Sequence, residues 1–109
     1  MFSLRNLELA QAAAKDIGLP NIKVMKCDLA SFASVREFCK QVDKEEKKVD
    51  ILVNNAAAFS TTRVITEDGE EMVFQVNHLS HFLLTNLLMD KMKASKAARI
   101  INVSSVGHW

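Results

Sequence analysis

Three strand-like runs alternate with three amphipathic helical patterns along this chain of 109 residues. Apolar residues recur at helical spacing over 6–17, after Ser31 or Ser34 as far as about residue 42, and over 66–93, which predicts three helices. Strands are predicted at 22–27, 49–53 and 99–105. This alternation requires parallel strands joined by crossover helices, so the sequence predicts an α/β fold with an open sheet in one domain.

Polar residues follow each predicted strand at the point where the strand ends. Asp28 follows the first strand, the amides and alanines of 54–57 follow the second, and Ser104 and Ser105 end the third. Ligands of open parallel sheets bind beyond the carboxyl ends of the strands, so these residues are expected to lie along one edge. The apolar run 51–53 is typical of a strand that is buried on both faces.

Several of these candidates have more than one interpretation. Asp28 could accept hydrogen bonds from an adenine amine or a ribose hydroxyl, or it could cap the following helix. Asn54 and Asn55 could shape the backbone beside a flat ligand, or they could only form a turn. Asn77 is unfavourable inside a helix. It is therefore either a core amide with hydrogen-bond partners or a residue that loosens the helix and holds a water near the strand ends.

Composition and spacing exclude other classes of function. The net charge is +1 and no basic run is present, so nucleic acid is not expected as a partner. The apolar runs are far shorter than the roughly 20 residues that span a bilayer, so no membrane segment is predicted. His78 and His81 lack a third ligand on their helical face, and no metal site is predicted. Cys27 and Cys39 match no metal spacing and indicate reduced thiols in an intracellular compartment.

Four stretches, taken in order, resemble the short-chain dehydrogenases/reductases, and among them the retinol dehydrogenase-like branch. They are Cys27–Leu29, Asp50–Ala57, the segment Thr66–Phe82 with its Thr-Glu-Asp-Gly and Asn-His-Leu-x-His-Phe motifs, and Arg99–Ser105. The resemblance covers nearly the whole chain. It implies part of a Rossmann-type, doubly wound parallel sheet that binds NADP(H). It also implies an oxidoreductase that interconverts a small-molecule alcohol and a carbonyl, such as a retinoid or lipid aldehyde.

The resemblance implies roles for individual residues. Asn77 matches the catalytic asparagine that helps organise a proton-relay water, and Ser105 matches the catalytic serine that orients the substrate oxygen. Asp28 matches a residue that contacts adenine, and Arg5 matches a basic position that favours the 2′-phosphate of NADP. The family's cofactor motif Asn-Asn-Ala-Gly is matched by Asn54, Asn55, Ala56 and Ala57, where Ala57 replaces the glycine. Ser80 also stands where this branch usually has glycine.

Two elements of the family have no counterpart in this sequence. The chain has three scattered glycines and no tyrosine. The family's Gly-rich turn lies before the first matched stretch, and its Tyr-x-x-x-Lys, whose tyrosine is the general acid and base, lies after the last one. The resemblance therefore implies an internal fragment, a partial NAD(P)-binding domain over 1–109, without the first strand and the C-terminal strands of the sheet. Such a fragment is expected to be inactive alone.

The alternative is a non-catalytic truncated isoform that acts as an interaction module. Without the first strand of the sheet, the predicted strand 49–53 would expose an unpaired edge. Edges of this kind invite self-association or pairing with another chain, here a full-length relative.

Overall fold

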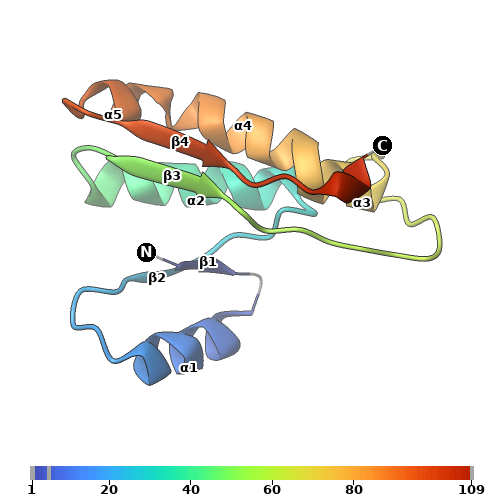
Figure 1. Ribbon diagram of the computed structural model, residues 1–109, viewed down its shortest axis with the longest axis horizontal. Coiled ribbons are helices and arrows are strands. Elements are labelled where there is room, and N and C mark those ends of the chain that lie inside the picture. The colour runs from blue at the N-terminus through green and yellow to red at the C-terminus, as the bar shows by residue number, and fades with distance from the viewer. Residues whose placement is uncertain (1, 5, 109) are drawn as a thin grey trace.

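The structure, a computed structural model, describes residues 2–4 and 6–108 (Figure 1). Helices and strands alternate along the chain, as predicted. In order, the elements are β1 (Phe2–Leu4), α1 (Leu7–Ile17), β2 (Val24–Lys26), α2 (Phe32–Glu45), β3 (Ile51–Asn54), α3 (Met72–Phe74), a π-helical segment (Gln75–Leu79), α4 (Ser80–Leu87), α5 (Met89–Lys93), β4 (Arg99–Asn102) and a 3-10 turn (Val106–His108).

Within the described residues, the strands form two parallel pairs. β1 pairs with β2, and β3 pairs with β4 in a register that places Ile51 opposite Arg99 and Asn54 opposite Asn102. The parallel direction confirms the predicted crossover architecture. β4 ends at Asn102, earlier than the predicted end at Ser105, so both candidate serines lie in the segment that follows the strand.

Helices α2 and α4 cover one face of the β3–β4 pair, whereas α1 lies beside β1 and β2, on the side away from α2 and α4 (Figure 1). The core lies between β2, α2 and the α4–α5 helices. Its buried members are Met25, Cys27, Val35, Phe38, Cys39, Val42, Leu84 and Leu88. Asp43 and Lys91 add an ion pair at 3.2 Å between α2 and α5.

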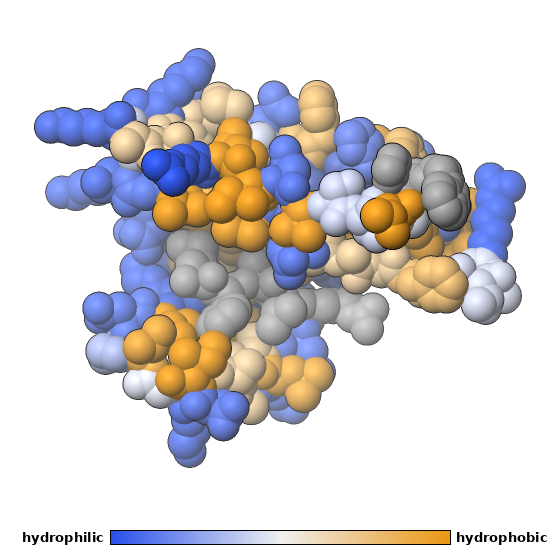
Figure 2. Space-filling model, in the orientation of Figure 1, coloured by the Kyte–Doolittle hydropathy of each residue, from blue (hydrophilic) through white to orange (hydrophobic). Residues whose placement is uncertain are grey.

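The expectation that strand 51–53 is buried on both faces is wrong. Ile51 and Val53 are 59% and 51% exposed, whereas Leu52 packs against the core. Side chains alternate across a strand, so only one face of β3 can meet the helices. Figure 2 shows apolar side chains gathered over β3 and β4 on the face toward the viewer.

The helix predicted over 66–93 begins later and is interrupted. Gly69 has a φ of 80°, in the left-handed region, and its N–H donates to the Thr66 carbonyl oxygen at 3.0 Å. Residues 66–69 therefore form a turn, which a continuous helix cannot contain. The helix starts at Met72, widens into the π-helical segment and breaks at Leu88, where ψ is 0°. Across the described residues, no helix is long and apolar enough to cross a membrane.

Candidate functional site

A cavity of about 980 Å³ opens beyond the carboxyl ends of β3 and β4. This is the edge where an open parallel sheet usually binds its ligands. One wall comes from the helical residues that follow the 66–69 turn, and the other from the segments that follow the two strands. The lining residues are Asn54, Asn55, Ala56, Ala57, Glu71, Val73, Phe74, Asn77, His78, His81, Phe82, Thr85, Asn86, Asn102, Val103, Ser104, Ser105 and Gly107.

Asn54 joins the two strands to the helix behind them. It is 6% exposed, and its Nδ2 donates to Asn102 Oδ1 at 2.8 Å and to Thr85 Oγ1 at 3.1 Å. Its Oδ1 is buried and has no hydrogen-bond partner among the described residues. Asn55, Ala56 and Ala57 follow as exposed residues along the cavity. The first amide of the motif thus ties the strand ends together, and its neighbours face the open space.

The side chain of Asn77 binds the backbone of a single residue, Ala58. The Ala58 N–H donates to Asn77 Oδ1 at 2.7 Å, and Asn77 Nδ2 donates to the Ala58 carbonyl oxygen at 3.0 Å. Both ends of the amide are used in this way, and the side chain is exposed rather than part of the core. Asn77 lies in the middle of the π-helical segment, a distortion that is frequent at functional sites.

Two histidines on the same helical stretch have different surroundings. His81 Nε2 lies 2.8 Å from the Ala56 carbonyl oxygen. His78 is exposed, stacks on Phe74 with ring centroids 5.4 Å apart, and lies tilted against Phe82 with ring centroids 6.5 Å apart. No cluster of three His, Cys, Asp or Glu side chains able to hold a metal occurs in the part of the chain that the structure describes.

Glu71 is the acidic residue of the cavity wall. Its carboxylate accepts hydrogen bonds from the backbone N–H groups of Phe74 at 2.8 Å and Val73 at 3.0 Å, at the start of α3. These two hydrogen bonds hold the pKa of Glu71 below its usual value. Glu71 is therefore a fixed negative charge at neutral pH rather than a proton donor.

The two serines after β4 lie on the cavity wall. Ser105 Oγ accepts a hydrogen bond from the Gly107 N–H at 3.2 Å. The cavity therefore brings together Ser104, Ser105, Asn77 and the 54–57 segment, which were predicted from separate strand ends.

Asp28 is not among the described residues that line this cavity. Its Oδ1 accepts from the Ala30 N–H at 3.0 Å, and its own N–H donates to Ser34 Oγ at 2.8 Å. The helix cap of α2 is Ser31, so the alternative in which Asp28 caps this helix is wrong. Asp28 instead forms a turn beyond the end of β2. Arg5 lies outside the described residues.

Sequence reasoning assigned no role to two fully buried polar residues, Gln75 and Ser80. Gln75 Nε2 donates to Asp68 Oδ2 at 2.8 Å, and Gln75 Oε1 accepts a hydrogen bond from the Thr66 hydroxyl. The same Asp68 oxygen accepts from the Phe32 N–H at 2.8 Å, at the first residue of α2. The 66–69 turn is thereby fixed to both helices.

Ser80 Oγ donates to the Leu29 carbonyl oxygen at 2.5 Å. This contact fixes the helix beside the cavity to the turn that contains Asp28. The signal for its burial was its spacing, because Ser80 lies on the same helical stripe as Leu84 and Leu88.

Comparison with known proteins assigns the chain to a family. Residues 1–108 match the family model of the short chain dehydrogenase. Retinol dehydrogenase 13 of Mus musculus is 53% identical over 112 residues, which cover 99% of this chain and 34% of that protein. The chain thus spans about a third of the length of this relative.

Solved structures agree with this assignment. A protein from Mycobacterium paratuberculosis superposes with a TM-score of 0.82 at 33% identity, over 98% of this chain and 37% of that one. The Pseudomonas aeruginosa RhlG/NADP active-site complex superposes with a TM-score of 0.75 at 28% identity, over 95% of this chain and 43% of that one. The fold is a partial Rossmann fold, and the chain belongs to the short-chain dehydrogenase family of oxidoreductases, in its retinol dehydrogenase-like branch.

Proposed function

We propose that this chain carries part of the active site of an oxidoreductase that prefers NADP(H) and interconverts an alcohol and a carbonyl. Asn77 and Ser105 serve the substrate in this proposal, and Asn54, Asn55, Ala56 and Ala57 line the cofactor. One observation carries it: a single cavity at the carboxyl ends of β3 and β4 contains all of these residues. Ligand sites of open parallel sheets occur at this edge.

The cavity residues fit the flat nicotinamide ring of a dinucleotide. The volume of about 980 Å³ is at the upper end of the roughly 300–1,000 Å³ typical of small-molecule sites. Ala56 and Ala57 leave room beside the strand ends, and Asn54 Oδ1 is a buried acceptor without a donor among the described residues. Bound NADPH would supply the hydride, and the 54–57 segment would hold the NADPH.

The preference for NADP(H) has two supports. The Pseudomonas aeruginosa neighbour is a complex with NADP. Arg5, by resemblance, would pair with the 2′-phosphate, and Asp28 would contact the adenine. The half-buried turn of Asp28 is held by Ser34 and Ala30, which gives its carboxylate a defined position.

The substrate is proposed to be a retinoid or a similar lipid aldehyde, because the mouse relative is a retinol dehydrogenase by name. The apolar rings of Phe74 and Phe82 on the cavity wall support an apolar substrate. In this proposal the Ser105 hydroxyl orients the substrate oxygen, and the Gly107 N–H that donates to Ser105 fixes the hydroxyl in place.

We expect no turnover by this chain alone. The family's general acid and base is a tyrosine, and this sequence contains none. Binding of the cofactor and turnover are therefore separate questions, and each needs its own measurement.

The test of cofactor binding is an equilibrium titration of the purified chain with NADPH and with NADH, followed by nucleotide fluorescence. We expect tighter binding of NADPH. The variant Ala56→Leu fills the cavity and should weaken binding about tenfold or more, as expected for overpacking of a fitted site. Ala12→Leu, at an exposed position of α1, is the matched control and should bind as the parent chain does. Failure of a cooperatively folded chain to bind either nucleotide would contradict the proposal.

The test of inactivity follows NADPH absorbance in the presence of retinal. Steady oxidation of NADPH at a rate proportional to the chain concentration would refute the expected inactivity, because it would require a proton donor other than tyrosine.

A second candidate function is an interaction module that pairs with a full-length relative. The observation that favours it is the apolar outer face of the β3–β4 pair, where Ile51, Val53, Ile101 and Val103 are each about half exposed (Figure 2). In the described residues β3 pairs with β4 only, so its other edge can accept a strand.

The test mixes the chain with full-length mouse retinol dehydrogenase 13 and measures the mass of the complex by light scattering. A discrete complex would support the module if Val53→Glu abolishes it and Val64→Glu preserves it. Val64 is another exposed valine and serves as the matched control. An aggregating or molten sample, or no complex, would count against it.

A further inference from the structure

Three polar side chains on one face of the helix contact three alternate residues of the segment 54–58, which begins at the last residue of β3 and runs along the cavity. The pairs are Asn77 with Ala58, His81 with Ala56, and Thr85 with Asn54. Four residues of a helix advance by about 6 Å, and two residues of an extended chain by about 6.6 Å. The two spacings nearly match, so side chains four residues apart on the helix meet every second residue of the 54–58 segment.

His81 is the middle pair of this ladder. The Ala56 carbonyl oxygen can only accept a hydrogen bond, so the proton of the imidazole must lie on Nε2, which donates at 2.8 Å. Nδ1 is then an acceptor, and it is buried without a partner among the described residues. The ring therefore makes one directed contact, to the backbone of the cofactor motif.

We propose that His81 is a positioning residue that fixes the 54–58 segment in the shape needed to receive the cofactor. The inference rests on the proposed function, in which 54–57 line NADP(H). Asn77 fixes the far end of the segment at Ala58 and Thr85 fixes its start at Asn54, whereas the exposed residues between them depend on His81. Without His81, the segment loses the contact in its middle, and the neighbouring hydrogen bond from the Ala58 N–H to Asn77 should open more often.

The energetics separate this role from a general contribution to stability. Replacement of His81 by alanine removes a hydrogen bond but also removes a buried nitrogen that has no partner. An unmet buried polar group is costly, so the two effects oppose one another and global stability should change little. The order of the 54–58 segment should change much more.

The experiment measures amide hydrogen exchange of the whole chain by NMR in four proteins: the parent, His81→Ala, His81→Gln and His78→Ala. His81→Ala should speed exchange of the Ala58 amide, which donates to Asn77, by about fivefold to tenfold, as loosening of one hydrogen bond predicts. Amides of α2 should be unaffected. His81→Gln keeps a side-chain N–H donor and should restore protection. His78→Ala alters an exposed, stacked histidine of the same helix and should leave Ala58 unchanged.

Unchanged exchange at Ala58 in a folded His81→Ala chain would overturn the proposal. Where this variant does not fold, the imidazole ¹⁵N shifts of the parent decide instead: the Nε2–H tautomer is expected, and an Nδ1–H tautomer would overturn the proposal. NADPH titration of the same proteins adds a separate arm. If the four proteins show the expected differences in amide exchange but the parent chain binds no NADPH, the proposed function is contradicted and the positioning role of His81 stays supported.

Discussion

The hydroxyl of Ser80 in α4 donates a hydrogen bond to the carbonyl oxygen of Leu29 at 2.5 Å. Ser80 is fully buried, and Leu29 follows Asp28 in the turn beyond β2. The contact therefore joins the helix that lines the cavity to the segment proposed to meet the adenine. Two parts of the proposed cofactor site are held at a fixed separation by one side chain.

Replacement of Ser80 by alanine should destabilise the chain by about 1–3 kcal/mol, because it removes a buried hydrogen bond and leaves the Leu29 carbonyl without this donor. Urea unfolding followed by circular dichroism measures the change. Ser104→Ala, a serine on the exposed cavity wall, is the matched control and should change stability by less than about 0.5 kcal/mol. Equal losses in the two variants would argue against a special role for the Ser80 contact.

Replacement of Gln75 by leucine should detach the 66–69 turn from the helix. Gln75 is fully buried, donates to Asp68 and accepts from Thr66, and hydrogen bonds to charged groups contribute about 1.5–3 kcal/mol each. We expect a loss of about 2 kcal/mol or more in urea unfolding, with faster amide exchange at Gly69. Asn86→Leu, at an exposed position of α4, is the control. Normal stability of Gln75→Leu would show that the network contributes little.

The burial of Cys39 leads to a prediction at high pH. Burial raises the pKa of the Cys39 thiol from 9.0 to about 12, so the folded chain keeps the proton in a range where the unfolded chain releases it. Stability from this group is complete below pH 9 and is lost as the pH rises toward 12, by about 1 kcal/mol per pH unit. Unfolding at pH 8, 9 and 10 should show a steeper decline for the parent than for Cys39→Ala. Identical slopes would contradict the prediction.

The same burial controls thiol chemistry. The side chains of Cys27 and Cys39 are both buried. Since the thiolate is the reactive form, neither should react with a thiol reagent at pH 8 until the chain unfolds. Rapid modification of the folded chain at a rate independent of added urea would show that this part of the core opens readily.

The elements that the sequence predicted well are those whose start and end are set by residues within or next to the element itself. The helix over 6–17 is present as Leu7–Ile17: Asn6 Oδ1 caps it by accepting from the Glu8 N–H at 3.0 Å, and Gly18 ends it with a φ of 72°. The approximate positions of the strands were predictable for a similar reason, because polar residues follow short apolar runs, although β4 ends three residues earlier than predicted. The meeting of Asn77, Ser105 and the 54–57 segment at one cavity follows from the parallel direction of the strands.

The errors concern features that depend on distant residues. The third helix starts late because residues 66–69 form a turn, and the hydrogen bond from the Phe32 N–H of α2 to Asp68, which holds this turn, cannot be read from periodicity. The exposure of Ile51 and Val53 depends on what covers the strand, and a run of apolar residues carries no information about that. The hydrogen bond between Asn77 and Ala58 also joins residues that are 19 positions apart, so the sequence pattern could not show it.

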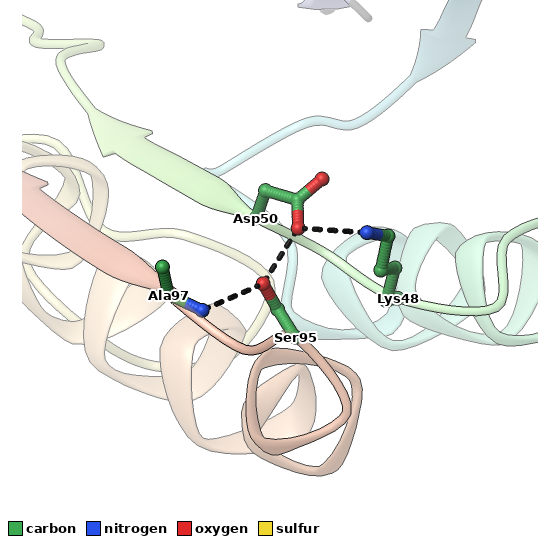
Figure 3. A network of polar contacts seen from close by, with 4 residues as sticks. All are labelled: Lys48, Asp50, Ser95 and Ala97. Atoms are coloured by element: carbon green, nitrogen blue, oxygen red, sulfur yellow. Dashed lines mark hydrogen bonds and ion pairs between the residues drawn. The ribbon is translucent and has the colours of Figure 1, made fainter.

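A small polar network lies just before the first residues of β3 and β4, at the end of these strands away from the cavity (Figure 3). It leads to a prediction about stability at acid pH. Ser95 Oγ donates to Asp50 Oδ1 at 2.6 Å, and Lys48 Nζ lies 3.4 Å from the same oxygen. The Ser95 hydrogen bond, with a further contribution from Lys48, holds the pKa of Asp50 below its ordinary value of 3.8. The folded state therefore favours the ionised carboxylate. Its contribution to stability is present above pH 3.8 and is lost as the pH falls through the lowered value.

Ser95→Ala should raise the pKa of Asp50 toward its ordinary value, because it removes the largest cause of the shift. NMR titration of the Asp50 carboxyl carbon measures this directly, and the other carboxyl signals of the chain serve as internal references. Lys48→Ala should also raise the pKa of Asp50, and added salt should reduce the effect of Lys48 but not that of Ser95, because screening acts on the charge pair in solvent. An unchanged Asp50 titration in Ser95→Ala would show that this hydrogen bond does not form in solution, and the acid-dependent stability of the strand ends would then need another source.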